Sequence, residues 1–288
     1  MSISIDSSLP VRPRGFVQRL AAALGVLLIW LVAATMLIPL LWMISTSLKA
    51  PGTEFQLPPR WIPDHPVWTN YLKVWRAIPF GRFFFNSTLV SACVTFGQVL
   101  TSSLAAFAFA RLTFPGRDKL FFAYLATLMI PGIVTLIPVF IIIHHLGWID
   151  TYQALIIPGL FSAYGTFLLR QFFLGIPLAL EDAARIDGCG PLRVYWNVIL
   201  PLSKPALVTL VIFTFMGAWR DFLWPLIVTN SMEMRTLTVG LSTFQGIYST
   251  EWTQLMAGSL MVMVPLVIVF IFNQRFFIEG IQLTGIKG

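Results

Sequence analysis

Two adjacent acids, Glu181 and Asp182, open the most polar stretch of this chain. They fall in the first half of a predicted short helix over 178–187, where carboxylates favour the positive end of the helix dipole. Ala183 and Ala184 follow and give the helix a small face that another protein can approach closely. A short helix with acidic edges and a small apolar face is suited to insertion into the groove of a soluble partner.

The residues after this helix indicate where it ends. Gly188 is placed to end the helix in a left-handed cap, and Gly190-Pro191 prevents its continuation. A second short helix is predicted over 192–200 and leads into the next apolar run. The same pattern also fits a surface hairpin of two helices that only links two apolar runs, and the residues alone leave both interpretations open. Residues 177–203 are called the polar segment below.

The composition of the whole chain indicates a membrane protein. Of its 288 residues, 57% are hydrophobic and 11% are charged, whereas about a quarter of the residues of a globular domain are charged. A soluble core of this length cannot hide so much apolar surface, so lipid must be part of the solvent. The net charge of +7 comes from scattered basic residues that flank apolar runs. This distribution indicates membrane topology rather than nucleic-acid binding. Cys93 and Cys189 are too few for a disulfide framework.

Six apolar runs are long enough to cross the bilayer as helices, which takes roughly 18 to 20 residues. Five runs carry no charge, and they are 20–48, 83–110, 120–149, 151–169 and 252–274. The sixth, 205–228, contains Arg220 and Asp221. Long continuous apolar runs predict helices, because barrel strands would alternate over about ten residues. The expected fold is an all-α membrane protein with six transmembrane helices and a short cytoplasmic coupling helix between the fourth and fifth.

Basic residues predict the orientation of these spans. Those of both termini and of the loops after the second and fourth spans fall on one side, which should be cytoplasmic. They are Arg12, Arg14, Arg19, Arg111, Arg117, Lys119, Arg170, Arg185, Arg193, Lys204, Arg275 and Lys287. The loop after the first span is also basic and is placed outside, although the opposite orientation would put the polar segment there.

The expected organisation is a cytoplasmic tail over 1–19, a six-span domain over 20–277 and a second cytoplasmic tail over 278–288. The first apolar run is too long for a signal peptide and is expected to be retained as a span. Proline and glycine interrupt several spans, which fits either a translocation path or ordinary helix curvature.

The polar segment resembles the cytoplasmic docking motif of binding-protein-dependent ABC importer permeases. The family pattern is Glu-Ala-Ala, three residues, Gly, nine residues, an aliphatic residue, any residue, and Leu-Pro. The positions that fill it here are Asp182, Ala183, Ala184, Gly188, Val198, Leu200 and Pro201. The first place holds Asp instead of Glu, with Glu181 directly before it. Which of the two acids would meet the partner is therefore open.

The resemblance extends over nearly the whole chain. Asn86-Ser87 and the stretches 105–114 and 222–225 look like the carbohydrate branch, and within it like the second permease subunit of maltose-type importers. The resemblance implies a bacterial inner-membrane, multi-pass permease that pairs with a related permease and docks on an ATPase dimer. It also implies a periplasmic or lipid-anchored protein that delivers a solute, expected to be a sugar or related polyol. Glycerol phosphate remains open as a solute.

The expected mechanism is alternating access, driven by an ATPase dimer that grips the coupling helix. The chain has no GxxxxGK[ST] loop, so it is expected to bind no cofactor itself, while the partner ATPase binds ATP and Mg. His144-His145 has no carboxylate or cysteine at coordinating spacing, so no metal site is expected.

Charges inside a predicted span are costly and are functional by default. Arg220 and Asp221 could line the solute path, with Trp219 and Trp224 stacking on a sugar face. The alternatives are a structural ion pair, or a helix end that lies nearer the interface.

The last external loop, 242–253, has a counterpart in maltose-type second subunits that reaches into the binding protein. The candidates for this contact are Gln245, Tyr248 and Trp252, and the alternative is a purely structural loop.

Two other functions would require features that the sequence lacks. A self-sufficient carrier or channel would require inverted repeats with paired broken helices, which are not detected. An intramembrane enzyme would require a motif such as HExxH or GxSxG, and the sequence has neither.

Overall fold

The computed structural model describes residues 16–246 and 249–285, and all regular elements within these ranges are helical. Four helices are long and apolar enough to cross a membrane, or up to six if each of two bent pairs forms one span. The prediction of an all-helical membrane protein is therefore confirmed.

Four of the predicted spans correspond to single long helical stretches. The first, second and sixth are α1 (Phe16–Ser47), α3 (Phe80–Arg111) and α14 (Trp252–Gly285). The fourth covers Tyr152–Leu174 and consists of α6 (Tyr152–Ile156), η2 (Ile157–Leu160) and α7 (Ala163–Leu174).

The third predicted span, 120–149, is sharply bent. It consists of α4 (Arg117–Ala126), η1 (Thr127–Met129) and α5 (Gly132–His145), with an angle of 100° at the break. Pro131 explains the bend. Its ring disfavours helical backbone at the preceding residue, and Ile130 is indeed extended, with φ −87° and ψ 113°.

The fifth predicted span, 205–228, ends earlier than expected. α11 (Lys204–Arg220) stops at Arg220, and Asp221 is extended, with φ −63° and ψ 127°. The Asp221 carboxylate accepts a hydrogen bond from the backbone N–H of Trp224, at the start of α12 (Leu223–Val228). Arg220 and Asp221 therefore lie at a helix end and not inside a continuous span.

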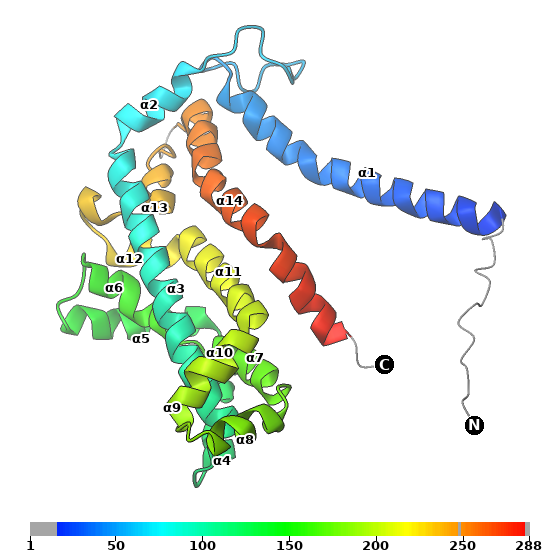
Figure 1. The fold of residues 1–288 in the computed structure, drawn as a ribbon. Coiled ribbons are helices and arrows are strands. Elements are labelled where there is room, and N and C mark those ends of the chain that lie inside the picture. Colours follow the sequence, from blue (N-terminus) through cyan, green and yellow to red (C-terminus); the bar gives the residue numbers. More distant parts are fainter. Residues whose placement is uncertain (1–15, 247–248, 286–288) are drawn as a thin grey trace.

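The two ends of the molecule carry different elements (Figure 1). The polar segment forms α8 (Leu178–Ile186), α9 (Pro191–Val194), the π-helix η3 (Tyr195–Ile199) and α10 (Leu200–Leu202). These helices gather with α4 at one end (Figure 1). The other end carries α2 (Thr69–Ala77), η4 (Met232–Met234) and α13 (Leu237–Ser242).

α3 lies at the centre of the bundle and packs most extensively against α7 and α11. Glycines allow the close approach of the fourth span. A Cβ atom at Gly159 would lie 2.9 Å from Val94 Cγ1, and one at Gly165 would lie 2.7 Å from Ser102 Oγ. α1 leaves the bundle, and only its C-terminal part approaches α14, so most of its apolar side chains are exposed (Figure 1).

Candidate functional site

The C-terminal end of α8 has the cap that the sequence predicts. Gly188 has φ +79°, a left-handed conformation that glycine adopts without the strain of a Cβ atom. Its N–H donates to the carbonyl of Arg185 at 3.0 Å, and the N–H of Cys189 donates to the carbonyl of Ala184 at 2.9 Å. The chain then turns into α9, which begins at Pro191.

The two acids of α8 face opposite environments. Glu181 is 1% exposed, whereas the next residue, Asp182, is exposed. Successive helical residues point about 100° apart, so one acid turns into the protein and the other turns outward. Ala183 and Gly188 are exposed with Asp182, and Ala184 is half-buried. In this conformation the carboxylate of Asp182 is accessible at the surface, and that of Glu181 is not.

Large aliphatic side chains accompany the exposed acid. Ile186 is 87% exposed and Leu192 is 67% exposed, on either side of the glycine turn. Neither residue was predicted to be functional, although exposed aliphatic residues that gather in a polar segment can mark a docking surface.

Glu181 is held by Arg111, the last residue of α3. The distance from Arg111 Nε to Glu181 Oε1 is 2.6 Å, and the two side chains are 4% and 2% exposed. Arg111 Nη2 also donates to the carbonyls of Phe173 at 2.6 Å and Ile176 at 2.7 Å. The guanidinium at the end of α3 thus contacts the end of α7, the link that follows α7, and α8.

The rest of the polar segment packs back onto the bundle. Helical backbone extends over 191–202, slightly beyond the predicted 192–200, and Pro201 is exposed within it. Val198 and Leu200 pack against the core. Tyr195 is buried, with its hydroxyl 2.7 Å from Ser103 Oγ of α3.

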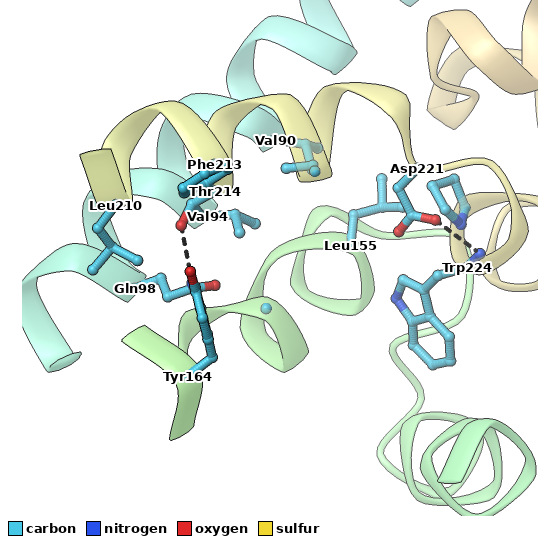
Figure 2. Close-up of a pocket in the computed structure, with 14 residues that line it drawn as sticks. Val90, Val94, Gln98, Leu155, Tyr164, Leu210, Phe213, Thr214, Asp221 and Trp224 are labelled. Atoms are coloured by element: carbon cyan, nitrogen blue, oxygen red, sulfur yellow. Dashed lines mark hydrogen bonds between the residues drawn. The ribbon is translucent and has the colours of Figure 1, made fainter. Parts of the chain in front are cut away.

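A second candidate site is a cavity of about 330 Å³ between α3, the fourth span, α11 and α12 (Figure 2). Its lining residues are Val90, Val94, Gln98, Leu155, Gly159, Tyr164, Leu210, Phe213, Thr214, Gly217, Ala218, Asp221, Trp224 and Pro225. Gln98 Nε2 donates to Thr214 Oγ1 at 2.9 Å across the wall. Asp221 is the one charged residue of this lining. The cavity therefore combines an apolar wall with a few polar groups, as small-molecule sites do.

The structure separates the four residues predicted for a solute path. Asp221 and Trp224 line the cavity, with the Trp224 indole N–H donating to the carbonyl of Ala154 at 2.9 Å. Trp219 is buried elsewhere and donates to the carbonyl of Val262 at 3.1 Å. Arg220 is exposed and is not part of the lining.

The polar lining residues Gln98, Tyr164 and Thr214 were missed by the sequence analysis. Of these three residues, Gln98 could have been predicted from the sequence, because a glutamine within an apolar run of a membrane protein needs a polar partner or a cavity.

Residues 242–246 and 249–253 of the loop predicted to be external are described by the structure. Gln245 is exposed and forms an isolated antiparallel bridge with Thr250, and the Trp252 ring lies edge-on to Phe55 at 5.5 Å. Tyr248 lies outside the described residues.

The Asn86-Ser87 pair anchors a neighbouring loop. Asn86 Nδ2 donates to the carbonyls of Glu233 and Arg235 at 2.7 and 2.9 Å, and Ser87 Oγ accepts from the N–H of Leu237 at 2.8 Å. Asp150 supports the same loop, since its Oδ1 accepts from the N–H groups of Asn230 and Ser231 at 2.8 and 3.0 Å.

The pKa of Asp150 lies below its ordinary value of 3.8. Burial alone would raise this pKa, but the hydrogen bonds from Ser231 and Asn230, together with the charge of Arg235, outweigh burial and favour the carboxylate. Over the described residues, no group of three or more His, Cys, Asp and Glu side chains gathers at a metal-binding geometry.

Comparison with known proteins identifies the family to which the sequence is similar. Residues 98–279 match the family described as binding-protein-dependent transport system inner membrane component. The chain is 37% identical to the sn-glycerol-3-phosphate transport system permease protein UgpE of Yersinia enterocolitica, over 79% of this chain and 84% of that protein. It is 40% identical to the arabinooligosaccharides transport system permease protein AraQ of Halalkalibacterium halodurans, over 72% of this chain and 74% of that protein.

A solved structure shares the fold. A chain from the crystal structure of a bacterial ABC transporter involved in the import of the acidic polysaccharide alginate superposes with a TM-score of 0.82 at 22% identity. The match covers 93% of this chain and 100% of that one. A second structure, of the alginate transporter in complex with a periplasmic protein bound to an alginate pentasaccharide, gives a TM-score of 0.59 at 14% identity.

Proposed function

Because the chain belongs to the family of inner-membrane components of binding-protein-dependent transport systems, we propose that it is one of two permease subunits of an ATP-driven importer for a sugar or related polyol. As a member of this family it is a multi-pass inner-membrane transport component and not an ATPase. The proposed partners are a related permease, a dimeric ATPase that binds ATP and Mg, and a periplasmic or lipid-anchored solute-binding protein.

The observation that carries this proposal is the exposed face of α8. Asp182 and Ala183 lie on it beside the turn at Gly188, at the end of the molecule opposite the external loops (Figure 1). Ile186 supplies an aliphatic anchor. A short helix that combines a carboxylate, a small residue and an aliphatic anchor fits a basic-edged groove of a soluble protein. We place the ATPase at this face.

In the proposed topology, the bent pair Arg117–Met129 and Gly132–His145 forms one span and α11 forms another, which with the four long helical stretches makes six spans within 20–277. The tails 1–19 and 278–288 and the polar segment are cytoplasmic. The basic residues Arg111, Arg117, Arg170 and Lys204 then share the side of α8, as the distribution of positive charge in membrane proteins favours.

The proposed mechanism is alternating access. ATP closes the ATPase dimer, the dimer displaces α8, and the helices that surround the cavity reorient from inward to outward facing. α3, α7 and α11 all contribute to the cavity wall and pack on one another, so a displacement of one is transmitted to the others.

The lining of the cavity favours a neutral solute. UgpE and AraQ are named for an anionic phosphate ester and for neutral oligosaccharides, respectively. Here the charged lining group is a carboxylate, Asp221, and none of the lining residues is basic. A carboxylate accepts hydrogen bonds from hydroxyl groups and repels a phosphate. We therefore propose a sugar or polyol in preference to glycerol phosphate.

The test is purification and reconstitution of the complex. The chain should co-purify with an ATPase and a second permease, and proteoliposomes should accumulate solute when the binding protein and ATP are supplied. Uptake by this chain alone, without ATP, would refute the proposal and support a self-sufficient secondary carrier or channel.

A further inference from the structure

The ion pair between Arg111 and Glu181 is buried in a part of the protein where most polar groups face water. Burial of two charges costs free energy that only close pairing and further hydrogen bonds offset. Nε lies 2.6 Å from the carboxylate, although this contact lacks the geometry of a hydrogen bond, and Nη2 donates to two backbone carbonyls. Solubility and surface charge do not explain this ion pair, because both of its side chains are buried.

The position of the pair supplies an explanation. Arg111 ends α3, while Phe173 and Ile176 lie at the end of α7 and in the link to α8. α3 and α7 both line the cavity, through Gln98 and Tyr164. The pair thus connects α8, which exposes Asp182 on the protein surface, with two helices that surround the candidate solute site.

The chemistry of arginine suits a rigid connection. Its guanidinium is planar and fixes the directions of several donors at once, whereas the ammonium of lysine is a single flexible point of charge. One plane contacts the end of α7, the link after it and α8, and the contact with α8 is the one to Glu181, so a rotation of α8 relative to α3 would separate the two buried charges. The neighbouring contact of Tyr195 with Ser103 adds a second link to α3.

We propose that Arg111 and Glu181 are positioning residues that join α8 to α3 and α7, so that a displacement of α8 is delivered to the cavity as a rigid-body movement. This inference rests on the proposed function. It assigns separate roles to the two acids of α8. Asp182 contacts the ATPase, whereas Glu181 transmits the movement inside the permease.

The experiment compares Glu181→Gln with the wild type in the reconstituted four-component complex. Solute uptake and ATP hydrolysis are measured in the same proteoliposomes. The expected result is normal assembly and ATP hydrolysis with about tenfold less solute moved per ATP, within the range by which internal residues change the coupling between sites. Asp182→Asn is the matched control, and it should instead weaken ATPase binding and lower hydrolysis and uptake together.

A second variant covers the case in which a lone buried charge prevents folding. Arg111→Met with Glu181→Leu replaces the pair by apolar side chains, a change that buried ion pairs often tolerate. The same loss of solute moved per ATP is expected. If the amount of solute moved per ATP is unchanged in this double variant, or in Glu181→Gln, the proposed role of the Arg111–Glu181 pair is wrong.

Cross-linking provides a separate readout. The variant Asp182→Cys should form a cross-link with the ATPase, and the variant Glu181→Cys should not. Efficient cross-linking from position 181 would contradict the internal role of Glu181. The wild-type complex tests the proposed function separately. Absence of ATP-driven uptake by the wild-type complex would refute the proposed importer function, whereas the variants test the role of the Arg111–Glu181 pair.

Discussion

Gln98 of α3 donates a hydrogen bond to Thr214 of α11 at 2.9 Å, across the wall of the cavity. The two residues lie 116 positions apart in the sequence. This contact is one of the few polar links between the helices that surround the candidate solute site.

Thr214→Val should reduce transport. The valine keeps the shape of threonine but leaves Gln98 Nε2 without its acceptor, at a cost of about 1–3 kcal/mol. We expect about a tenfold lower uptake rate in proteoliposomes. Thr209→Val on the same helix is the control, because its hydroxyl binds only the carbonyl of Pro205 within α11. Equal losses in both variants would show that the effect is general to the helix.

Asp221→Asn should weaken selectivity for neutral solutes. Asparagine can still accept the hydrogen bond from Trp224, but it no longer repels an anion. Competition assays should show inhibition of uptake by an anionic solute at about tenfold lower concentration, as expected for removal of one nearby like charge. Arg220→Gln is the control and should leave affinity and rate unchanged, since Arg220 does not line the cavity.

Asp182→Lys should impair docking of the ATPase. Charge reversal at an interface contact costs several kcal/mol and places like charges together, so the Kd for the ATPase should rise at least about tenfold. Asp118→Lys makes the same change at an exposed position of α4, at the same end of the molecule. If both variants bind the ATPase like the wild type, the docking face of α8 is wrongly assigned.

Gly188→Ala should destabilise the turn after α8. The left-handed backbone at φ +79° costs a non-glycine residue of the order of 1 kcal/mol. Proteolysis within the polar segment should therefore become faster. Gly190→Ala is matched to it, because Gly190 has φ −71° and open space around its Cα. A similar effect in both would contradict the conformational explanation.

The loop that Asp150 supports should loosen in acid. Its folded pKa lies below the ordinary value of 3.8, so the stabilisation is fully present above that value and is lost as the pH falls through the folded pKa. The amides of Asn230 and Ser231 should lose protection against hydrogen exchange, measured relative to their intrinsic exchange rates, below about pH 4. Asp150→Asn should remove this pH dependence, and its persistence would point to another carboxylate.

Local sequence patterns predicted most of the helices and one cap. Four of the five charge-free runs correspond to α1, α3, α14 and the fourth span, because a helix satisfies its own backbone hydrogen bonds in lipid, whereas the remaining run, 120–149, is bent at Pro131. Gly188 was predictable because its role depends only on its own backbone. The early end of α11 was not, because it depends on the turn that Asp221 and Trp224 form together.

The candidate site was predictable only where it is local. The acidic and small residues of α8 were evident from spacing. The burial of Glu181 was not, because its partner lies at the end of a helix two spans earlier. The cavity was missed for the same reason, since Gln98 and Thr214 meet only when α3 and α11 pack.

The partnership of Arg111 and Glu181 also has an order in time. The ribosome adds Glu181 about 70 residues after Arg111, which at 5–20 residues per second takes roughly 4–14 s. In the proposed topology, the arginine lies at a cytoplasmic helix end that lacks its acidic partner during this interval, and positive charges at such ends favour the cytoplasmic side. We therefore expect the same side chain to favour this orientation of the nascent chain first and to be enclosed when the polar segment is synthesised.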